Sequence, residues 1–181
     1  MMAKMESFGE ALLSRASHLL ASLAPGDLLA IALALLFIRL ARYAGMWVFA
    51  VVALPGTMLH ELSHFMVALV LGARPSFPSL IPSKVGRVWR LGEVRFQAGH
   101  LRAMFVALAP LLLVPLALWW ALAFIAHATW PWYLLHVWTV AALLHACFPS
   151  RTDWQLAFPA IAVLTVPLML WVAYCFFVGA K

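Results

Sequence analysis

Long apolar runs separated by short polar breaks make up most of the chain. A helix needs roughly 20 apolar residues to cross the hydrocarbon core of a bilayer, and several of these runs are long enough. The pattern therefore predicts an all-α integral membrane protein, in which one polytopic domain covers residues 27–181. About five transmembrane helices are expected, over residues 28–43, 46–71, 101–126, 132–148 and 154–178.

The boundary between the first two spans is open to two interpretations. Arg39 and Arg42 interrupt the end of the first span, which either tilts there or runs on towards Val52. In the second case the helix would break at "LPGT", residues 54–57, because Pro55 has no backbone N–H to donate. The polar stretch that follows would then lie on a separate, shorter helix.

Residues 1–26 differ from the rest because their apolar and polar positions alternate with helical spacing. We expect an N-terminal interfacial amphipathic helix that ends at Pro25-Gly26, with a frayed tail as the alternative. Acidic residues, Glu6 and Glu10, stand where a secretory signal peptide would be basic, so no cleaved signal is expected. The apolar side would carry Leu12, Leu13, Leu19, Leu20 and Leu23, and the polar side Lys4, Glu6, Arg15 and His18.

Composition and charge support a membrane location and suggest an orientation. Hydrophobic residues make up 66% of the chain and charged residues 10%, whereas a soluble domain has about half and about a quarter. Residues 73–102 are the densest cationic stretch, so the positive-inside rule places them and the N-terminus in the cytoplasm. The short chain favours a bacterial inner (cytoplasmic) membrane. Contact with anionic membrane lipid accounts for the net charge of +6, and no nucleic acid is needed as a partner.

The second predicted span contains "HELSH", residues 60–64, in surroundings otherwise suited to lipid. His60 and His64 are four residues apart and therefore lie on one helix face, where two imidazoles can bind one zinc ion. Glu61 has the position of the general base that accepts a proton from zinc-activated water. Ionisable groups at membrane depth are costly and are usually functional. The alternatives are a polar cluster between helices and a proton relay.

A catalytic zinc site needs a third protein ligand beside an open position for water. Asp153 in "FPSRTDWQ" is the best candidate, because it follows the fourth span on the same predicted side of the membrane as "HELSH". Its neighbour Arg151 leaves a surface ion pair as the alternative. His145 is a reserve ligand or a partner that orients the site. The remaining candidates are Glu93, His100, His127 and His136.

Apolar and polar residues alternate over residues 84–98, which predicts a short basic hairpin or re-entrant segment after the second span. Gly92 is expected to form its turn or a bulge. The edge at Val94, Arg95 and Phe96 could pair with an extended substrate strand, since a helical peptide bond must be unwound before water can attack it. A basic loop lying on anionic headgroups is the alternative.

Three segments, "HELSHFMVALVLGARP", "ALAPLLL" and "FPSRTDW", together resemble the site-2 protease family of intramembrane zinc metallopeptidases, especially its short bacterial members. The resemblance covers roughly residues 46–156. It implies a metalloprotease-like membrane domain in which His60, His64 and Asp153 bind zinc and Glu61 is the base. The chain departs from the family at Trp154, where a glycine usually follows the aspartate, and in having no asparagine.

Three functions are compatible with these residues. The leading hypothesis is a hydrolase, an intramembrane zinc metalloprotease that cuts a transmembrane or membrane-proximal peptide with Glu61 as general base. The alternative is a catalytically inactive, protease-like accessory or assembly subunit of a membrane complex. A small transporter or channel with a His/Glu relay is a third hypothesis, and the absence of an inverted repeat disfavours it. A homo-oligomer or a partner membrane subunit is open in each case.

Overall fold

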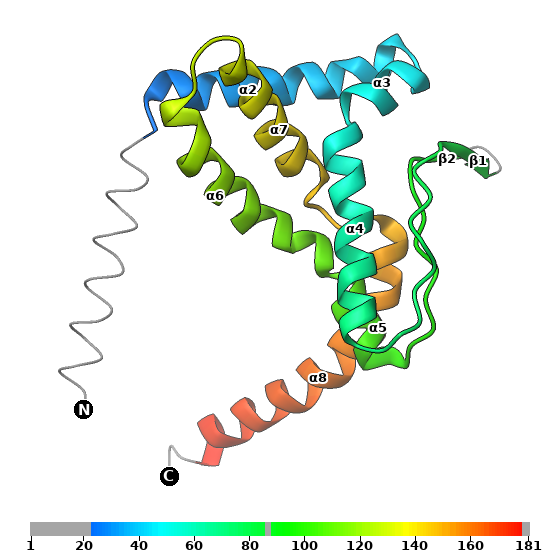
Figure 1. The fold of residues 1–181 in the computed structure, drawn as a ribbon. Helices are drawn as coiled ribbons and strands as arrows, with labels where there is room; N and C mark the ends of the chain where they lie inside the picture. Colours follow the sequence, from blue (N-terminus) through cyan, green and yellow to red (C-terminus); the bar gives the residue numbers. More distant parts are fainter. Residues whose placement is uncertain (1–22, 86–87, 179–181) are drawn as a thin grey trace. The chain divides into compact units, whose positions relative to one another are not determined.

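The computed structural model describes residues 23–85 and 88–178 (Figure 1). The described chain is mostly helical and divides into two compact units. One unit contains the residues up to Gly56 together with Leu113–His145, and the other contains Thr57–Leu112 and the residues from Ala146 onward. The interfacial helix predicted over residues 1–26 lies almost entirely outside the described residues. Pro25, which was expected to end it, is instead the first residue of a helix.

The first unit consists of short helices that side-chain hydrogen bonds fasten together. Asp27 accepts the backbone N–H of Ala24 at 2.9 Å and thereby caps the first of these helices, and it also accepts the hydroxyl of Tyr133 at 2.8 Å. Trp138 Nε1 donates to the carbonyl oxygen of Val52 at 2.9 Å, which satisfies a helix-end carbonyl. The helices are α2 (Pro25–Ala41), η1 (Arg42–Ala44), α3 (Met46–Val52), α6 (Leu113–Phe124), η3 (Ile125–His127) and α7 (Trp132–Ala146).

Two breaks interrupt the chain between the first two predicted spans. Gly45, with φ of 114°, ends the short 3₁₀ turn after α2 in a conformation that residues with a Cβ rarely adopt. The second break lies at Ala53, where α3 and α4 (Leu54–Val70) are bent by 72°. This break directly precedes "LPGT", so "HELSH" does lie on its own helix and the first span does not run on to Val52.

Two described helices are long and apolar enough to cross a membrane, and the bent pair α3 and α4 could add a third span. The two long apolar helices cover His100–His127 and Arg151–Phe176. The five spans predicted from hydropathy are therefore not supported. Helix α2 has 17 residues and α7 has 15, and both are therefore shorter than the roughly 20 residues that cross a bilayer core.

The second unit places α4, α5 (His100–Ala107), η2 (Ala109–Leu112) and α8 (Arg151–Val178) together. Helix α5 packs on α8 through a buried cluster of Met104, Ala107, Ala157 and Ala160, in which the alanines let the two helices approach closely. On its other side α5 contacts α4 through Val106 and Ala68. The beginning of α8 is thereby brought to the middle of α4.

A long two-stranded ribbon, residues 73–97, connects α4 to α5 and runs beside α4 (Figure 1). It begins at a glycine C-cap, where Gly72 has φ of 65° and the N–H of Ala73 donates to the carbonyl of Ala68 at 2.8 Å. Strands β1 (Ser83–Val85) and β2 (Val88–Arg90) pair in antiparallel register at its far end. A hairpin is present in this segment, but Gly92, which was expected to form its turn or a bulge, is not the turn, because it lies in the arm that follows β2.

Prolines explain why the incoming arm was not recognised from the sequence. The arms are joined at Ala73 and Gln97, Ser76 and Arg95, Ser79 and Glu93, and Ser83 and Arg90. The incoming arm is residues 73–83 and the outgoing arm is residues 90–97. Between each two successive joined pairs, the incoming arm has one residue more than the outgoing arm. Each of these three longer segments contains one proline, Pro75, Pro78 or Pro82. Proline cannot donate to a ladder and is tolerated at such bulges, so this arm pairs without a regular alternation.

Candidate metal centre

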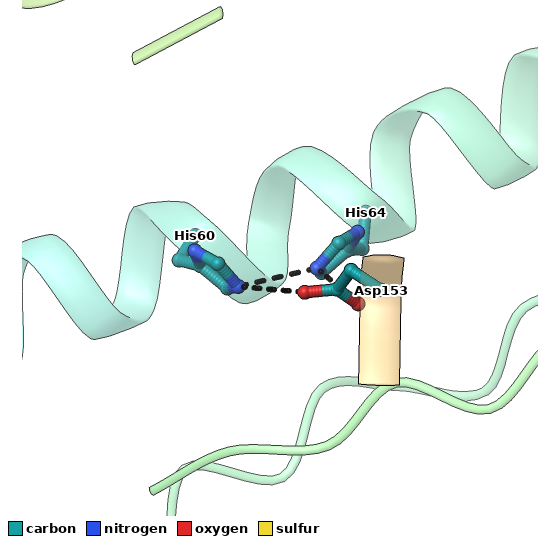
Figure 2. Close-up of side chains that lie close together, drawn as sticks. All are labelled: His60, His64 and Asp153. Atoms are coloured by element: carbon teal, nitrogen blue, oxygen red, sulfur yellow. Dashed lines mark hydrogen bonds and ion pairs between the residues drawn. The ribbon is translucent and has the colours of Figure 1, made fainter. Parts of the chain in front are cut away.

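His60 and His64 lie one turn apart on α4, and their rings point towards each other and towards Asp153 at the start of α8 (Figure 2). The two Nε2 atoms are 3.2 Å apart. Asp153 Oδ2 is 3.8 Å from His60 Nε2, and Oδ1 is 3.5 Å from His64 Nε2. One ligand atom from each of the three residues lies within 4.8 Å of the others, and no ion is included in the structure.

Backbone carbonyls fix the orientation of both imidazole rings. His60 Nδ1 donates to the carbonyl oxygen of Ala146 at 2.7 Å, and His64 Nδ1 donates to that of Val106 at 2.7 Å. Because a carbonyl oxygen can only accept, Nδ1 carries the proton in both rings, and in a neutral ring Nε2 then has a free lone pair. Two such lone pairs, 3.2 Å apart beside a carboxylate, repel each other unless a positive charge lies between them.

Asp153 is held in place by a reciprocal cap at the start of α8. The backbone N–H of Ser150 donates to Asp153 Oδ2 at 2.6 Å, and the N–H of Asp153 donates to Ser150 Oγ at 3.2 Å. This is a capping box with aspartate in the third helical position. The sequence signal, Ser150 three residues before Asp153, was available and was overlooked. The Asp153 side chain therefore both caps α8 and faces the two histidines.

The donor set fits a zinc ion with catalytic coordination. Two imidazole nitrogens and one carboxylate oxygen are a common ligand set of catalytic zinc, which leaves a fourth position open. Each imidazole also has the backbone partner on its other nitrogen that metal-binding histidines usually have. The same donors also hold ferrous iron in some oxygenases. Glu61 adds a further carboxylate close to these candidate ligands.

Glu61 follows His60 on α4 and is 8% exposed. It lies close enough to both histidines, to Asp153 and to Glu93 to interact with them electrostatically. The ribbon covers it, since the Gly92 backbone packs directly against the Glu61 side chain. A carboxylate next to three candidate ligands is in the position that a proton acceptor requires.

The other histidines that the sequence offered as ligands do not join this group of three. His145 belongs to the other compact unit, where its ring lies edge-on to Phe49 with centroids 5.8 Å apart. His136, in that same unit, accepts a hydrogen bond from Trp120 Nε1 at 3.2 Å. Glu93 forms an ion pair with Arg95 at 2.9 Å, which raises the pKa of that guanidinium.

Of the three residues expected at the substrate-binding edge of the ribbon, Val94 and Phe96 lie on the open edge and Arg95 does not. Arg95 pairs with its own ribbon, because its carbonyl accepts the N–H of Ser76 at 2.8 Å and its N–H donates to Ser76 Oγ at 3.1 Å. Among the described residues, the backbone N–H and C=O groups of Val94 and Phe96 have no such partner. Since successive residues of a strand face opposite edges, Val94 and Phe96 lie on the open edge and Arg95 does not.

Comparison with models of known protein families, with curated proteins and with solved structures gives no match. The likeness to site-2 proteases therefore depends on the motifs of the chain itself.

Proposed function

We propose that the chain is an intramembrane zinc metalloprotease of the site-2 protease type, which cuts a transmembrane or membrane-proximal peptide. The observation that supports this most strongly is the meeting of His60, His64 and Asp153, with each imidazole already oriented by a backbone carbonyl. Glu61 adds a buried carboxylate from the same helical turn as His60. Such a combination of metal ligands and a base is typical of hydrolytic zinc enzymes.

In the proposed mechanism each residue of the site has a separate role in hydrolysis. When bound, zinc supplies a Lewis acid that lowers the pKa of a coordinated water towards neutrality. His60, His64 and Asp153 hold the ion, while the Ala146 and Val106 carbonyls keep the two imidazoles from turning away. Glu61 accepts the proton of the attacking water and later gives it to the leaving amine. The carbonyl carbon thus gains a hydroxyl group, and the peptide C–N bond breaks.

The open edge of the ribbon is the proposed binding surface for substrate. A helical peptide bond is shielded by its own hydrogen bonds, so the substrate must be extended before it is cut. The unpaired backbone groups of Val94 and Phe96 can form ladder hydrogen bonds with such an extended segment. This surface lies on the arm that contains Gly92, next to Glu61.

The Val94→Pro variant tests this surface, because proline removes the outward N–H. One lost hydrogen bond of about 1 kcal/mol should raise KM roughly fivefold, with zinc content unchanged. Val94→Ala keeps the N–H and should lose much less. Equal losses in the two variants would show that the side chain, and not the backbone edge, contacts the substrate.

We place the enzyme in a bacterial inner membrane as a multi-pass protein with a cytoplasmic N-terminus. In this arrangement α2 and α7 also lie within the membrane. Large apolar side chains of both helices are exposed, which suits contact with lipid: Leu28, Leu29, Leu33, Leu36, Phe37, Leu134 and Leu135. Labelling of single cysteines with an impermeant reagent in intact cells would test this topology, and labelling of the ribbon from outside would contradict it.

The proposed activity is tested by mapping new N-termini in a bacterial membrane fraction incubated with the purified protein. The wild type should produce N-termini within or beside transmembrane segments, and chelation of zinc should abolish them. Glu61→Gln should lower their rate of formation by about 10²–10⁴-fold while zinc stays bound. His136→Gln, a change in the other unit, is the matched control. If Glu61→Gln is silent and a partner protein co-purifies, the chain is an inactive accessory subunit instead.

A further inference from the structure

Gly92 approaches Glu61 more closely than any side chain would permit. A Cβ atom added at Gly92 would lie 2.5 Å from Glu61 Cγ, 2.6 Å from Oε1 and 2.7 Å from Cδ, whereas ordinary contact begins at 3.4 Å. Gly92 does not have a positive φ, so its backbone conformation would accept an alanine. The requirement for glycine at this position is therefore steric, and the three nearest atoms all belong to the Glu61 side chain.

The contact cannot be relieved by a small movement of the carboxylate. The nearest atom is Cγ, which is the second carbon of the side chain, so only a change of rotamer at χ1 moves it away. The ribbon is also restrained on both sides of the contact. On the incoming arm Phe77 stacks on Phe65 of α4 with centroids 5.6 Å apart, and at the base Phe96 packs on the buried cluster that contains Ala68.

We propose that Gly92 is the positioning residue of Glu61. Its backbone packs against the Glu61 side chain and confines it to its present buried rotamer, next to the candidate ligand His60. Any larger residue at position 92 turns the carboxylate out of the site while the zinc ligands stay in place. The catalytic meaning of this contact rests on the proposed function, but the contact itself can be tested without any protease assay.

The test measures the reactivity of Glu61 towards a water-soluble carbodiimide, followed by mass spectrometry of the purified protein in detergent. Glu61 should react slowly in the wild type, because it is 8% exposed. In Gly92→Ala the rate should rise several-fold, with zinc content unchanged. Gly99→Ala is the matched control, since no atom lies within 4 Å of the Cβ that it adds. An unchanged Glu61 rate in Gly92→Ala would overturn the proposal.

A second measurement covers the case in which Gly92→Ala folds poorly. The melting temperatures of the wild type, Gly92→Ala, Glu61→Ala and the double variant form a cycle. If the clash is with Glu61, Gly92→Ala lowers the melting temperature in the wild type but hardly at all in Glu61→Ala. Equal losses in both backgrounds would show that Gly92 serves only the ribbon and would overturn the proposal. Absence of proteolysis in the wild type would contradict the proposed function and leave this cycle unaffected.

Discussion

Two pairs of histidines lie in different environments. One pair is His60 and His64 on α4, and the other is His136 and His145 on α7. In the α4 pair each Nδ1 is held by a backbone carbonyl, and both Nε2 atoms face one carboxylate. In the α7 pair His136 Nδ1 already accepts the Trp120 N–H, and the ring stacks on Phe124 with centroids 5.2 Å apart. His145 lies against Phe49 and within electrostatic reach of Arg39 and Arg42.

The difference teaches what distinguishes a ligand from a packing residue in an apolar helix. A polar side chain on an apolar helix is common to both pairs and therefore does not identify either pair as a metal site. A metal site needs oriented nitrogen donors that converge on one point together with an anionic group, and of the two pairs only the α4 pair meets these conditions. Near His145 the neighbouring charges are cationic, which disfavours a bound cation.

Removal of one α4 histidine should have the largest effect. His64→Ala deletes a proposed ligand, so zinc affinity should fall by more than the 10–100-fold that loss of an outer partner costs, and proteolysis should cease. His136→Ala, its counterpart on α7, should bind zinc like the wild type. Titration with a zinc-competing chelator measures both. Similar losses in the two variants would remove the distinction between the pairs.

Asp153→Asn tests whether the Asp153 carboxylate is the reason why the α4 histidines, and not the α7 histidines, bind zinc. The amide keeps the shape of the side chain and loses the charge, so zinc affinity should fall by about 100-fold. The chain contains one other aspartate, Asp27, and Asp27→Asn is the control. If Asp153→Asn binds zinc normally, the third ligand is another residue.

Ser150→Ala tests how much the helix cap contributes to the position of Asp153. The variant removes the hydroxyl that accepts the Asp153 N–H and costs about 1 kcal/mol of capping energy. We expect zinc affinity to fall by about tenfold, because Asp153 keeps its bond from the Ser150 N–H but gains freedom. Ser150→Thr should restore the wild-type affinity. No rescue by threonine would show that the hydroxyl is not responsible.

The smallest effect is expected when the lone pair of His136 is freed. Trp120→Phe removes the indole N–H and should lower the free energy of unfolding by about 1 kcal/mol. Zinc binding should not change, because no carboxylate of residues 23–85 or 88–178 forms a metal-binding group with His136 as Asp153 does with the α4 pair. A second zinc per chain in this variant would show that a free imidazole is sufficient.

Local features of the site could be predicted from the sequence, whereas features that depend on helix ends could not. The placement of His60 and His64 on one face follows from a spacing of four residues, and it needs no tertiary information. Their approach to Asp153 depends on how α5 and α8 pack, and the sequence offered only topology in support. That the three residues bind zinc is still a prediction.

The spans and the ribbon show where a hydropathy pattern fails. The boundary predicted between residues 43 and 46 agrees with the break at Gly45, whereas hydropathy alone left the break at Ala53 as one of two interpretations. In the ribbon, Gly92 was expected to form a turn or a bulge because glycine often marks one. The actual reason for this glycine is its contact with Glu61, which lies 31 positions earlier in the chain and is invisible to any local pattern.

The central claim is that His60, His64 and Asp153 hold one zinc ion, and X-ray absorption at the zinc edge of the purified, zinc-supplied protein tests it most directly. The account predicts about one zinc per chain, bound by nitrogen and oxygen only, with the scattering signature of two imidazoles. The spectrum should be lost in His64→Ala. Absence of bound zinc, a sulfur ligand, or an unchanged spectrum in His64→Ala would contradict the claim.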